Sequence, residues 1–292
     1  MTIFNFGSIN IDNFYYLPRL PGPGETISTD RHTTALGGKG ANQSIAVRRA
    51  GSDVRHIGAV GPDGAWCRDE MAQAGVDITH VMTRDVATGH ANVCIDAHGE
   101  NMIVLMPGAN RYFDWAKVEG ALDGLGPGDI LILQNEVNLV RAAAEFAQTR
   151  GAKVIYSAAP FDADAVREVM PFCDLLVMNE VEAAQLADAL GVTAEQIDVP
   201  EVLITKGSQG AVWRDQKTGD EIFVAAHQVT PVDTTGAGDC FLGNFAAGLD
   251  QGLDLTDALR RASAASAIQV TREGTASVMP TAEEVTAYLA AR

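Results

Sequence analysis

The sequence predicts an α/β protein with a doubly wound, mostly parallel sheet that is covered by helices on both faces. Short apolar runs alternate with amphipathic stretches along most of the chain, which is the pattern of strands buried on both faces. Glycine-rich turns open helical patterns at two places, residues 37–40 and 235–238. Two segments, about 12–35 and 88–108, leave this alternation and predict a small β lid over the sheet edge.

Composition is that of one packed domain. The 292 residues are 47% hydrophobic and 20% charged, and they contain no repeat, low-complexity tract or linker, so we expect a single domain over 1–292. The formal charge of −17, without a basic run, argues against binding to nucleic acid or to an anionic membrane surface. A bound nucleotide would therefore be held by local groups.

Cysteine and histidine spacing excludes several kinds of site. The four cysteines are far apart and match no metal-ligand spacing, so reduced thiols in a cytoplasmic protein are expected. No apolar run has membrane length and no signal peptide is recognisable. The six histidines show no paired spacing, which argues against a catalytic zinc, and there is no G-x-S-x-G nucleophile motif.

The first strand, residues 2–7, delivers Asn10 and Asp12 just past its carboxyl end, where open α/β sheets bind ligands. The turn GSINID lacks the G-x-G-x-x-G pattern of a dinucleotide-binding oxidoreductase. A Pro- and Gly-rich segment follows at 14–34 and forms one part of the predicted lid. The runs 90–96 and 101–106, separated by the turn-like AHGE, form the other part. The alternative is a surface meander without a role.

The segment GGKGANQ at 37–43 leads into an amphipathic helix that ends near Ala50, so its glycines bring a helix N-terminus close to a small ligand. It is not a Walker A loop, because Lys39 is followed by Gly40 rather than by Ser or Thr. Alone, it could equally be a flexible turn.

Further apolar runs of the buried-strand type follow at 54–60, 129–133, 153–157, 175–178 and 202–205. Polar groups lie at or after their carboxyl ends, which parallel strands bring to one edge of the sheet. These groups are Glu136, Ser157, Asn179 with Glu182, and the stretch 206–210.

The stretch TPVDTTGAGDCFLG, residues 230–243, leads through a glycine turn into a helix that is predicted to begin near Asp239. The free N–H groups of its first turn form an anion site. A carboxylate at that place suits proton handling beside a transferring phosphoryl group. The alternative is an Asp that caps its own helix.

DTTGAGDCFLG and GGKGANQ resemble the two sequence motifs of the PfkB family of carbohydrate kinases, and they stand in the expected order. The similarity runs through nearly the whole chain, with the ribokinase subgroup as the nearest match. The resemblance implies a ribokinase-like three-layer fold, a doubly wound mostly parallel sheet with a small β lid. It also implies an ATP- and Mg²⁺-dependent sugar kinase and a homodimer formed through the lid.

The resemblance assigns roles to individual residues. Asp239 would be the catalytic base, beside the N–H groups of Gly236, Ala237 and Gly238. The sugar pocket would comprise Asn10, Asp12, Gly38, Lys39, Asn42, Glu136 and Asp239. The nucleotide site would comprise Asn179, Thr205, Lys206, Gly207, Ser208, Gly210 and Gly238. As alternatives, Glu136 is a solvated loop acid and 205–210 is a bare turn.

Two cation sites are also implied. Asn179 and Glu182 would organise Mg²⁺ indirectly, although a plain helix cap would look identical. A monovalent cation, K⁺, would be held mostly by backbone carbonyls of Asp233, Thr235, Gln269, Arg272, Gly274 and Ser277. The alternative is a simple acidic loop, since Glu273 and a spacing one residue shorter alter the pattern.

The substrate expected from this pocket is a free pentose, D-ribose first, phosphorylated on its terminal hydroxyl. The alternatives are a keto-sugar acid, a fructose-type sugar or a nucleoside as substrate, or a non-catalytic sugar sensor. The chain departs from the ribokinase pattern at 157–160, at Leu242, and between 185 and 202, where a helix is predicted to be reduced to residues 193–197 or missing.

Overall fold

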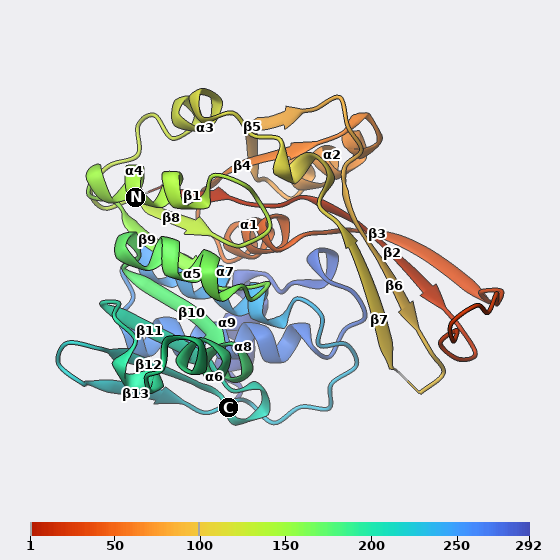
Figure 1. The fold of residues 1–292 in the computed structure, drawn as a ribbon. Helices are drawn as coiled ribbons and strands as arrows, with labels where there is room; N and C mark the ends of the chain where they lie inside the picture. The colour runs from red at the N-terminus through yellow and green to blue at the C-terminus, as the bar shows by residue number, and fades with distance from the viewer. Residues whose placement is uncertain (1, 99) are drawn as a thin grey trace.

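A nine-stranded sheet forms the middle layer of this computed structural model, which describes residues 2–98 and 100–292 (Figure 1). The strand order is β13-β12-β11-β10-β9-β8-β1-β4-β5. Neighbours from β11 to β5 pair in parallel, and β12 and β13 pair antiparallel. The strands are β1 (Ile3–Phe6), β4 (Val54–Val60), β5 (Asp77–Thr83), β8 (Ile130–Leu133), β9 (Lys153–Ser157), β10 (Leu175–Asn179), β11 (Glu201–Thr205), β12 (Ala211–Asp215) and β13 (Glu221–Val224).

Helices cover both faces of the sheet, which confirms the predicted three layers. Successive side chains of β8 point to opposite faces: Ile130 and Ile132 enter one buried cluster, whereas Leu131 and Leu133 enter the other. The first cluster packs under α1 (Lys39–Arg49), α2 (Ala65–Gln73), α7 (Ala237–Asp250), α8 (Leu255–Gln269) and α9 (Ala282–Ala290). The second packs under α3 (Trp115–Ala121), α4 (Val140–Thr149), α5 (Ala163–Val169) and α6 (Glu180–Leu190).

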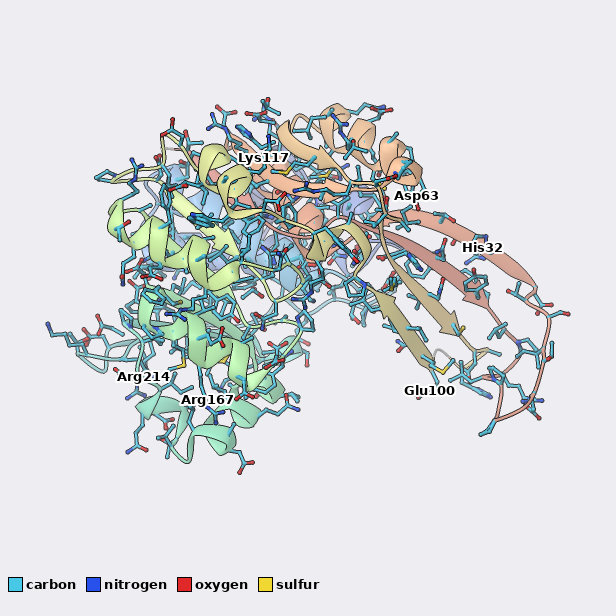
Figure 2. The ribbon with its side chains drawn as sticks, turned by 45° about the horizontal axis from the view of Figure 1, so that its top comes forward. His32, Asp63, Glu100, Lys117, Arg167 and Arg214 are labelled. Carbon is cyan, nitrogen blue, oxygen red and sulfur yellow. The ribbon has the colours of Figure 1, made fainter. Side chains whose placement is uncertain are left out.

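A separate four-stranded sheet of order β3-β2-β6-β7 extends from one end of this body (Figure 1). Its strands are β2 (Asn10–Tyr16), β3 (Arg31–Gly37), β6 (Gly89–Ile95) and β7 (Asn101–Met106). Figure 2 shows His32 on this sheet, apart from Lys117, Arg167 and Arg214 on the body. Its strands lie in the two segments expected for a lid, although β2 begins two residues before the first segment, at Asn10, and β3 ends two residues after it, at Gly37. The predicted hairpin turn at 97–100 includes Gly99, which lies outside the described residues.

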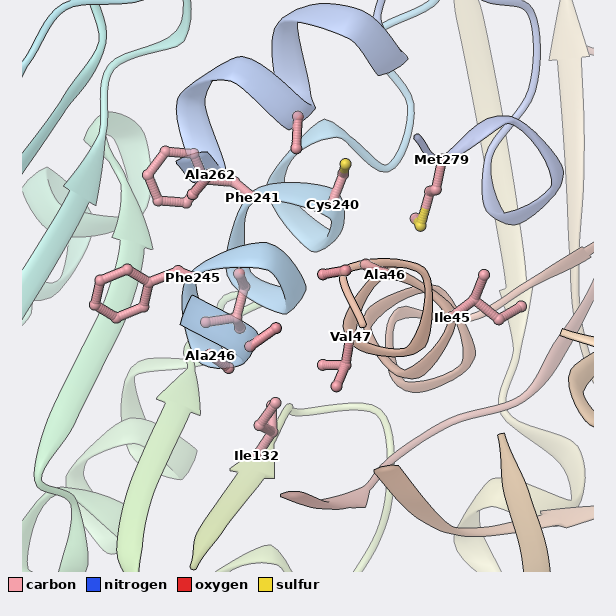
Figure 3. Packing of buried hydrophobic residues seen from close by; sticks show 14 of the residues in the cluster. Ile45, Ala46, Val47, Ile132, Cys240, Phe241, Phe245, Ala246, Ala262 and Met279 are labelled. Atoms are coloured by element: carbon pink, nitrogen blue, oxygen red, sulfur yellow. The ribbon is translucent and has the colours of Figure 1, made fainter. Parts of the chain in front are cut away.

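Helices α1 and α7 pack against each other in the middle of the molecule. Figure 3 shows Ala46 and Val47 of α1 beside α7. A Cβ added to Gly243 of α7 would lie 2.4 Å from the Cβ of Ala46 and 2.8 Å from the carbonyl oxygen of Gln43. The absence of a side chain at Gly243 therefore lets the two helices approach closely.

Short 3₁₀ turns complete the described chain. The helix predicted to be reduced at 193–197 is one such turn, η4, in which the side chains of Thr193 and Gln196 cap each other's backbone. Among the described residues, none of the helices combines the length and apolar character that crossing a bilayer requires. The turns are η1 (Pro62–Gly64), η2 (Gly108–Arg111), η3 (Met170–Phe172), η4 (Ala194–Gln196), η5 (Gly207–Gln209) and η6 (Ala276–Val278).

Candidate active site

The polar residues predicted after the parallel strands do meet at one edge of the large sheet. Glu136 follows β8, Asn179 ends β10, and Thr205 ends β11 directly opposite Asn179 in the strand register. Since β8, β9, β10 and β11 are consecutive neighbours, their carboxyl ends form a continuous row. At this edge Glu136 contacts Lys39 at the start of α1, and Asp239 lies in the first turn of α7.

The turn before α7 has the backbone conformation that its glycine predicts. Gly236 is the N-cap, with φ 74° in the left-handed region, where a residue with a side chain is strained. The helix begins at Ala237, two residues earlier than predicted. The N–H of Ala237 donates to the carbonyl of Thr234, 3.2 Å away, so it is engaged within the turn. Beside Gly238, a Cβ would meet no atom within 4 Å, so this side of the helix end has open space.

Asp239 does not cap its own helix. Its side chain is buried, with 8% exposed. Its Oδ2 accepts a hydrogen bond from Asn42 Nδ2 (3.1 Å), and its Oδ1 accepts one from Gln43 Nε2 (2.8 Å). Both donors lie on α1, so the carboxylate is held by the neighbouring helix while it stays at the positive end of α7.

Glu136 and Asn10 are oriented by hydrogen bonds on the sugar side of the predicted site. Glu136 Oε2 accepts from the backbone N–H of Lys39 (3.0 Å) and from the Ser8 hydroxyl. Asn10 Oδ1 accepts from Asn110 Nδ2 (2.8 Å). Glu136 is therefore tied to the first turn of α1, whose N-cap is Gly38, rather than being a solvated loop acid.

The charged side chains of the candidate site act on one another. Burial raises the pKa of Asp12 to about 7, and the carboxylates of Glu136 and Asp239 add to the increase while Lys39 opposes it. Burial by itself lowers the pKa of Lys39, but the surrounding carboxylates, Asp239 and Glu136 foremost, raise it overall. The candidate site thus brings three acids into the electrostatic field of one ammonium, a set of acceptors and donors suited to a ligand made of hydroxyls.

The predicted nucleotide loop forms a tight turn. Lys206 N–H donates to the carbonyl of Gly210 (2.7 Å), closing the loop around η5, and Ser208 is exposed at its tip. Next to it, Asn179 and Glu182 form a capping box: Glu182 N–H donates to Asn179 Oδ1 (2.9 Å) and Asn179 N–H donates to Glu182 Oε2 (2.8 Å). The cap occupies one carboxylate oxygen of Glu182. The charge of Glu182 also contributes to raising the pKa of Lys39.

Four of the six residues of the predicted K⁺ loop are closely linked by hydrogen bonds. Gln269 Nε2 donates to the carbonyls of Thr235 (2.8 Å) and Gly274 (3.3 Å), and Asp233 accepts from the N–H groups of Thr235 (2.9 Å) and Gly274 (3.1 Å). These four residues are therefore brought together. The other two reach this group through single contacts: Arg272 N–H donates to the carbonyl of Gln269 (3.0 Å), and Ser277 Oγ would lie 3.4 Å from a Cβ on Gly274. Their other hydrogen bonds lead elsewhere, from Arg272 to Glu284 and the carbonyl of Val278, and from Arg49 to the carbonyl of Ser277.

Comparison with known proteins decides the family. Residues 2–282 match the model of the pfkB family carbohydrate kinases. This chain belongs to the PfkB family of carbohydrate kinases. A ribokinase of Haemophilus influenzae is 34% identical, covering 99% of this chain and 98% of its own, and a deoxyribokinase of Salmonella typhi is 32% identical over 99% of each. The structure of Arabidopsis thaliana ribokinase complexed with ribose and ATP superposes with a TM-score of 0.84, at 28% identity and 98% coverage of both chains.

Several polar residues of the candidate site were not predicted from the sequence. For those beside β1 and β8 the signal is an amide or hydroxyl within or directly beside a buried apolar run, as in IFNFGS and ILILQN, whereas Gln43 follows a glycine motif and Asn110 lies in the turn η2. Such residues are buried with partners, since an unpaired polar group in the core is costly. They are Asn5, Ser8, Gln43, Asn110 and Gln134.

Proposed function

We propose that this PfkB enzyme transfers the γ-phosphoryl group of ATP to the primary hydroxyl of D-ribose, giving ribose 5-phosphate. The observation that carries the proposal is the position of Asp239, at the positive end of α7 and within electrostatic reach of Asp12 and Lys39. A base beside an anion-binding helix end is the arrangement that phosphoryl transfer to a hydroxyl requires. The non-catalytic sensor does not explain why such a base is retained.

In this proposal Asp239 removes the proton of the attacking hydroxyl. The N–H groups of residues 236–238 offset negative charge on the transferring group, with Gly236 and Gly238 as the main donors because Ala237 N–H is engaged with Thr234. The nucleotide would lie along Asn179, Thr205, Lys206, Gly207, Ser208 and Gly210. Open space beside Gly238 supports a ligand there.

Recognition of ribose would come from Asn10, Asp12, Gly38, Lys39, Asn42 and Glu136. Two carboxylates, two amides and an ammonium pair well with hydroxyls. The chain is similar to both a ribokinase and a deoxyribokinase, so its response to the 2-hydroxyl of the sugar decides between these two substrates. A site built to pair a hydroxyl leaves polar groups unmatched when that hydroxyl is absent, so we expect ribose to be preferred over deoxyribose.

Mg²⁺ is the proposed companion of ATP. Glu182 fits an indirect role, because its capping bond uses one oxygen and leaves the other for a water of the ion, and Asn179 holds the helix start in place. Mg²⁺ keeps several waters and binds through few carboxylates in such sites. When bound, the ion would neutralise charge on the phosphates.

K⁺ is proposed as an activator, held between the turn before α7 and the loop after α8. The fit is supported by Gln269, whose buried Oε1 has no hydrogen-bond partner while its Nε2 meets the carbonyls of Thr235 and Gly274. Rotation of that amide would present a third oxygen to the same point, an acceptor set suited to a cation. Such an ion would steady the N–H groups of the adjacent turn.

The whole chain is proposed to act as one kinase domain in which segments 12–35 and 88–108 serve as the lid. The lid also supports a homodimer. Strand β7 is an edge strand and its apolar side chains are exposed, between 42% and 57% of each, which favours pairing with a second copy. They are Met102, Ile103, Val104, Leu105 and Met106.

A cytoplasmic location is proposed because the cysteines, all within the described residues, are not joined in disulfides. All four are free thiols, which is typical of a reducing compartment. They are Cys67, Cys94, Cys173 and Cys240.

A coupled assay with ATP across ribose, deoxyribose, fructose, a keto-sugar acid and nucleosides tests the proposal. We expect the highest kcat/KM with ribose. A preference of about tenfold or more for another acceptor would overturn the ribose assignment while leaving the kinase in place. Omission of Mg²⁺, and replacement of K⁺ by a bulky organic cation, should each reduce the rate.

A further inference from the structure

A continuous row of buried amides leads from the first strand to the carboxylate of Asp239. Gln43, on α1, donates from Nε2 to Asp239 Oδ1 at 2.8 Å. Its Oε1 accepts from Gln134 Nε2 at 2.7 Å, and Gln134 Nε2 also donates to Asn5 Oδ1 at 2.9 Å. Asn5, Gln43 and Gln134 are at most 1% exposed, so solvent takes no part in this row.

One backbone group sets the direction of the whole row. Asn5 Nδ2 donates to the carbonyl oxygen of Gly40 at 3.0 Å, and a carbonyl can only accept. Asn5 must therefore turn its Oδ1 toward Gln134, which in turn must present Nε2. The oxygen of Gln43 is thereby drawn to Gln134, and its nitrogen is left facing Asp239.

We propose that Gln43 is a positioning residue for Asp239, and that Asn5 and Gln134 hold its amide so that an N–H faces the carboxylate. The inference rests on the proposed role of Asp239 as the base. Together with Asn42, Gln43 supplies one hydrogen bond to each carboxylate oxygen. Each oxygen keeps lone-pair capacity for the proton of the attacking hydroxyl, while the plane of the carboxylate is held.

The direction of the row matters electrostatically. A hydrogen bond donated to a carboxylate favours its ionised form, which is the form that acts as a base. The reversed amide would put the oxygen of Gln43 against an oxygen of Asp239. Loss of the row would thus free the orientation of the base and remove a hydrogen bond to its ionised form, whereas loss of an amide that only fills space would do neither.

Three variants separate these possibilities. Gln43→Met removes the donor, and we expect kcat to fall about 10- to 100-fold, the size expected for one lost hydrogen bond to a charged group, with the KM values nearly unchanged. Gln43→Glu places a second carboxyl against Asp239, so the acid limb of the kcat–pH profile should move to higher pH. Gln134→Met frees the amide of Gln43 and should give part of the loss in kcat.

The double variant Gln43→Met with Gln134→Met makes the test specific to the row. If Gln134 acts through Gln43, the double variant loses no more kcat than Gln43→Met alone, whereas independent effects would multiply. Asn244→Ala is the matched control, because Asn244 is a buried amide on the same helix as Asp239 that donates to the carbonyl of Cys240 instead. It should lower thermal stability and leave kcat and the pH profile unchanged.

Wild-type kcat in a folded Gln43→Met enzyme, an unmoved pH profile in Gln43→Glu, or multiplying losses in the double variant would overturn the inference. If Gln43→Met does not fold, Gln43→Glu and Gln134→Met decide it. Asp239→Asn measured in parallel separates the two proposals. Full activity of Asp239→Asn would contradict the proposal that Asp239 is the base. An inactive Asp239→Asn beside a fully active Gln43→Met would contradict only the positioning role of Gln43.

Discussion

Arg31 of the lid and Glu273 of the loop after α8 form an ion pair, with 3.0 Å between Nη2 and Oε1. The Tyr16 hydroxyl donates to the same carboxylate oxygen at 3.3 Å, and the guanidinium of Arg31 lies 3.7 Å from the centre of the Tyr16 ring. Strands β2 and β3 are thereby joined to the loop that carries Gly274. Glu273, which departs from the expected cation-loop pattern, thus has a contact of its own with the lid.

We expect Glu273→Gln to raise the KM for sugar while leaving kcat unchanged, because the pair holds the lid and takes no part in the reaction. Both side chains are more than half exposed, so the increase should stay below about fivefold and shrink at high salt. Steady-state kinetics at two salt concentrations measures it. Glu25→Gln is the control, since its pair with Arg19 lies within the lid segment and should leave KM unaltered.

Asp239→Asn should lower kcat by a factor on the order of 10² to 10⁴, the size expected for loss of a general base, while the fold and nucleotide binding persist. The amide is nearly isosteric with the carboxylate. Both oxygens of Asp239 accept hydrogen bonds from α1, so the fold of the variant must be checked together with its activity. Single-turnover measurements at saturating sugar, with calorimetric titration of nucleotide, would check both parts. Wild-type turnover in this variant would show that Asp239 is not the catalytic base.

Asp12 should make stability depend on pH. Because its pKa rises from 3.8 to about 7 on folding, the native protein binds a proton in that range that the unfolded chain does not. The free energy of unfolding therefore falls as pH increases from 3.8 to about 7. In Asp12→Asn this contribution is absent. Urea denaturation on either side of the window should show a smaller loss of stability in the variant, and equal losses in both proteins would contradict the assignment.

Gly243→Ala should destabilise the protein by about 1–3 kcal/mol, because the new Cβ would collide with Ala46 and with backbone atoms of α1 that cannot turn aside. Gly120→Ala is the matched control. Gly120 lies in α3, a Cβ there meets nothing within 4 Å, and alanine is the better helix former, so stability should rise by up to about 1 kcal/mol. Thermal unfolding of both variants makes the comparison. Equal changes would mean that the contact between α1 and α7 is not tight.

The sequence predicts the parallel centre of the sheet well because these strands are buried on both faces. The runs 54–60 and 153–157 are observed with the predicted bounds as β4 and β9. It misses β5, β12 and β13, which lie toward the two edges of the sheet. In β5, for example, exposed Asp77 and Thr79 interrupt the apolar run, so the pattern of a buried strand is lost.

The candidate site could likewise be predicted only in part. Residues in short glycine-containing motifs, such as Lys39 and Asp239, could be predicted because the motif itself specifies a turn and a helix start. Residues that orient them could not. Gln134 reaches Gln43 across 91 positions of the chain and Ser8 reaches Glu136 across 128, and only the folded sheet brings these pairs together.

The contact between α1 and α7 also sets when this enzyme can first become active during its synthesis. Asp239 lies 196 and 197 positions beyond the two amides that hold it, so a nascent chain has exposed the donors long before the carboxylate exists. Closing so long a loop is entropically costly, and contacts of this kind form late in folding. During refolding, helical circular dichroism should therefore return before catalysis does, and the appearance of activity marks the arrival of α7 in its place beside α1.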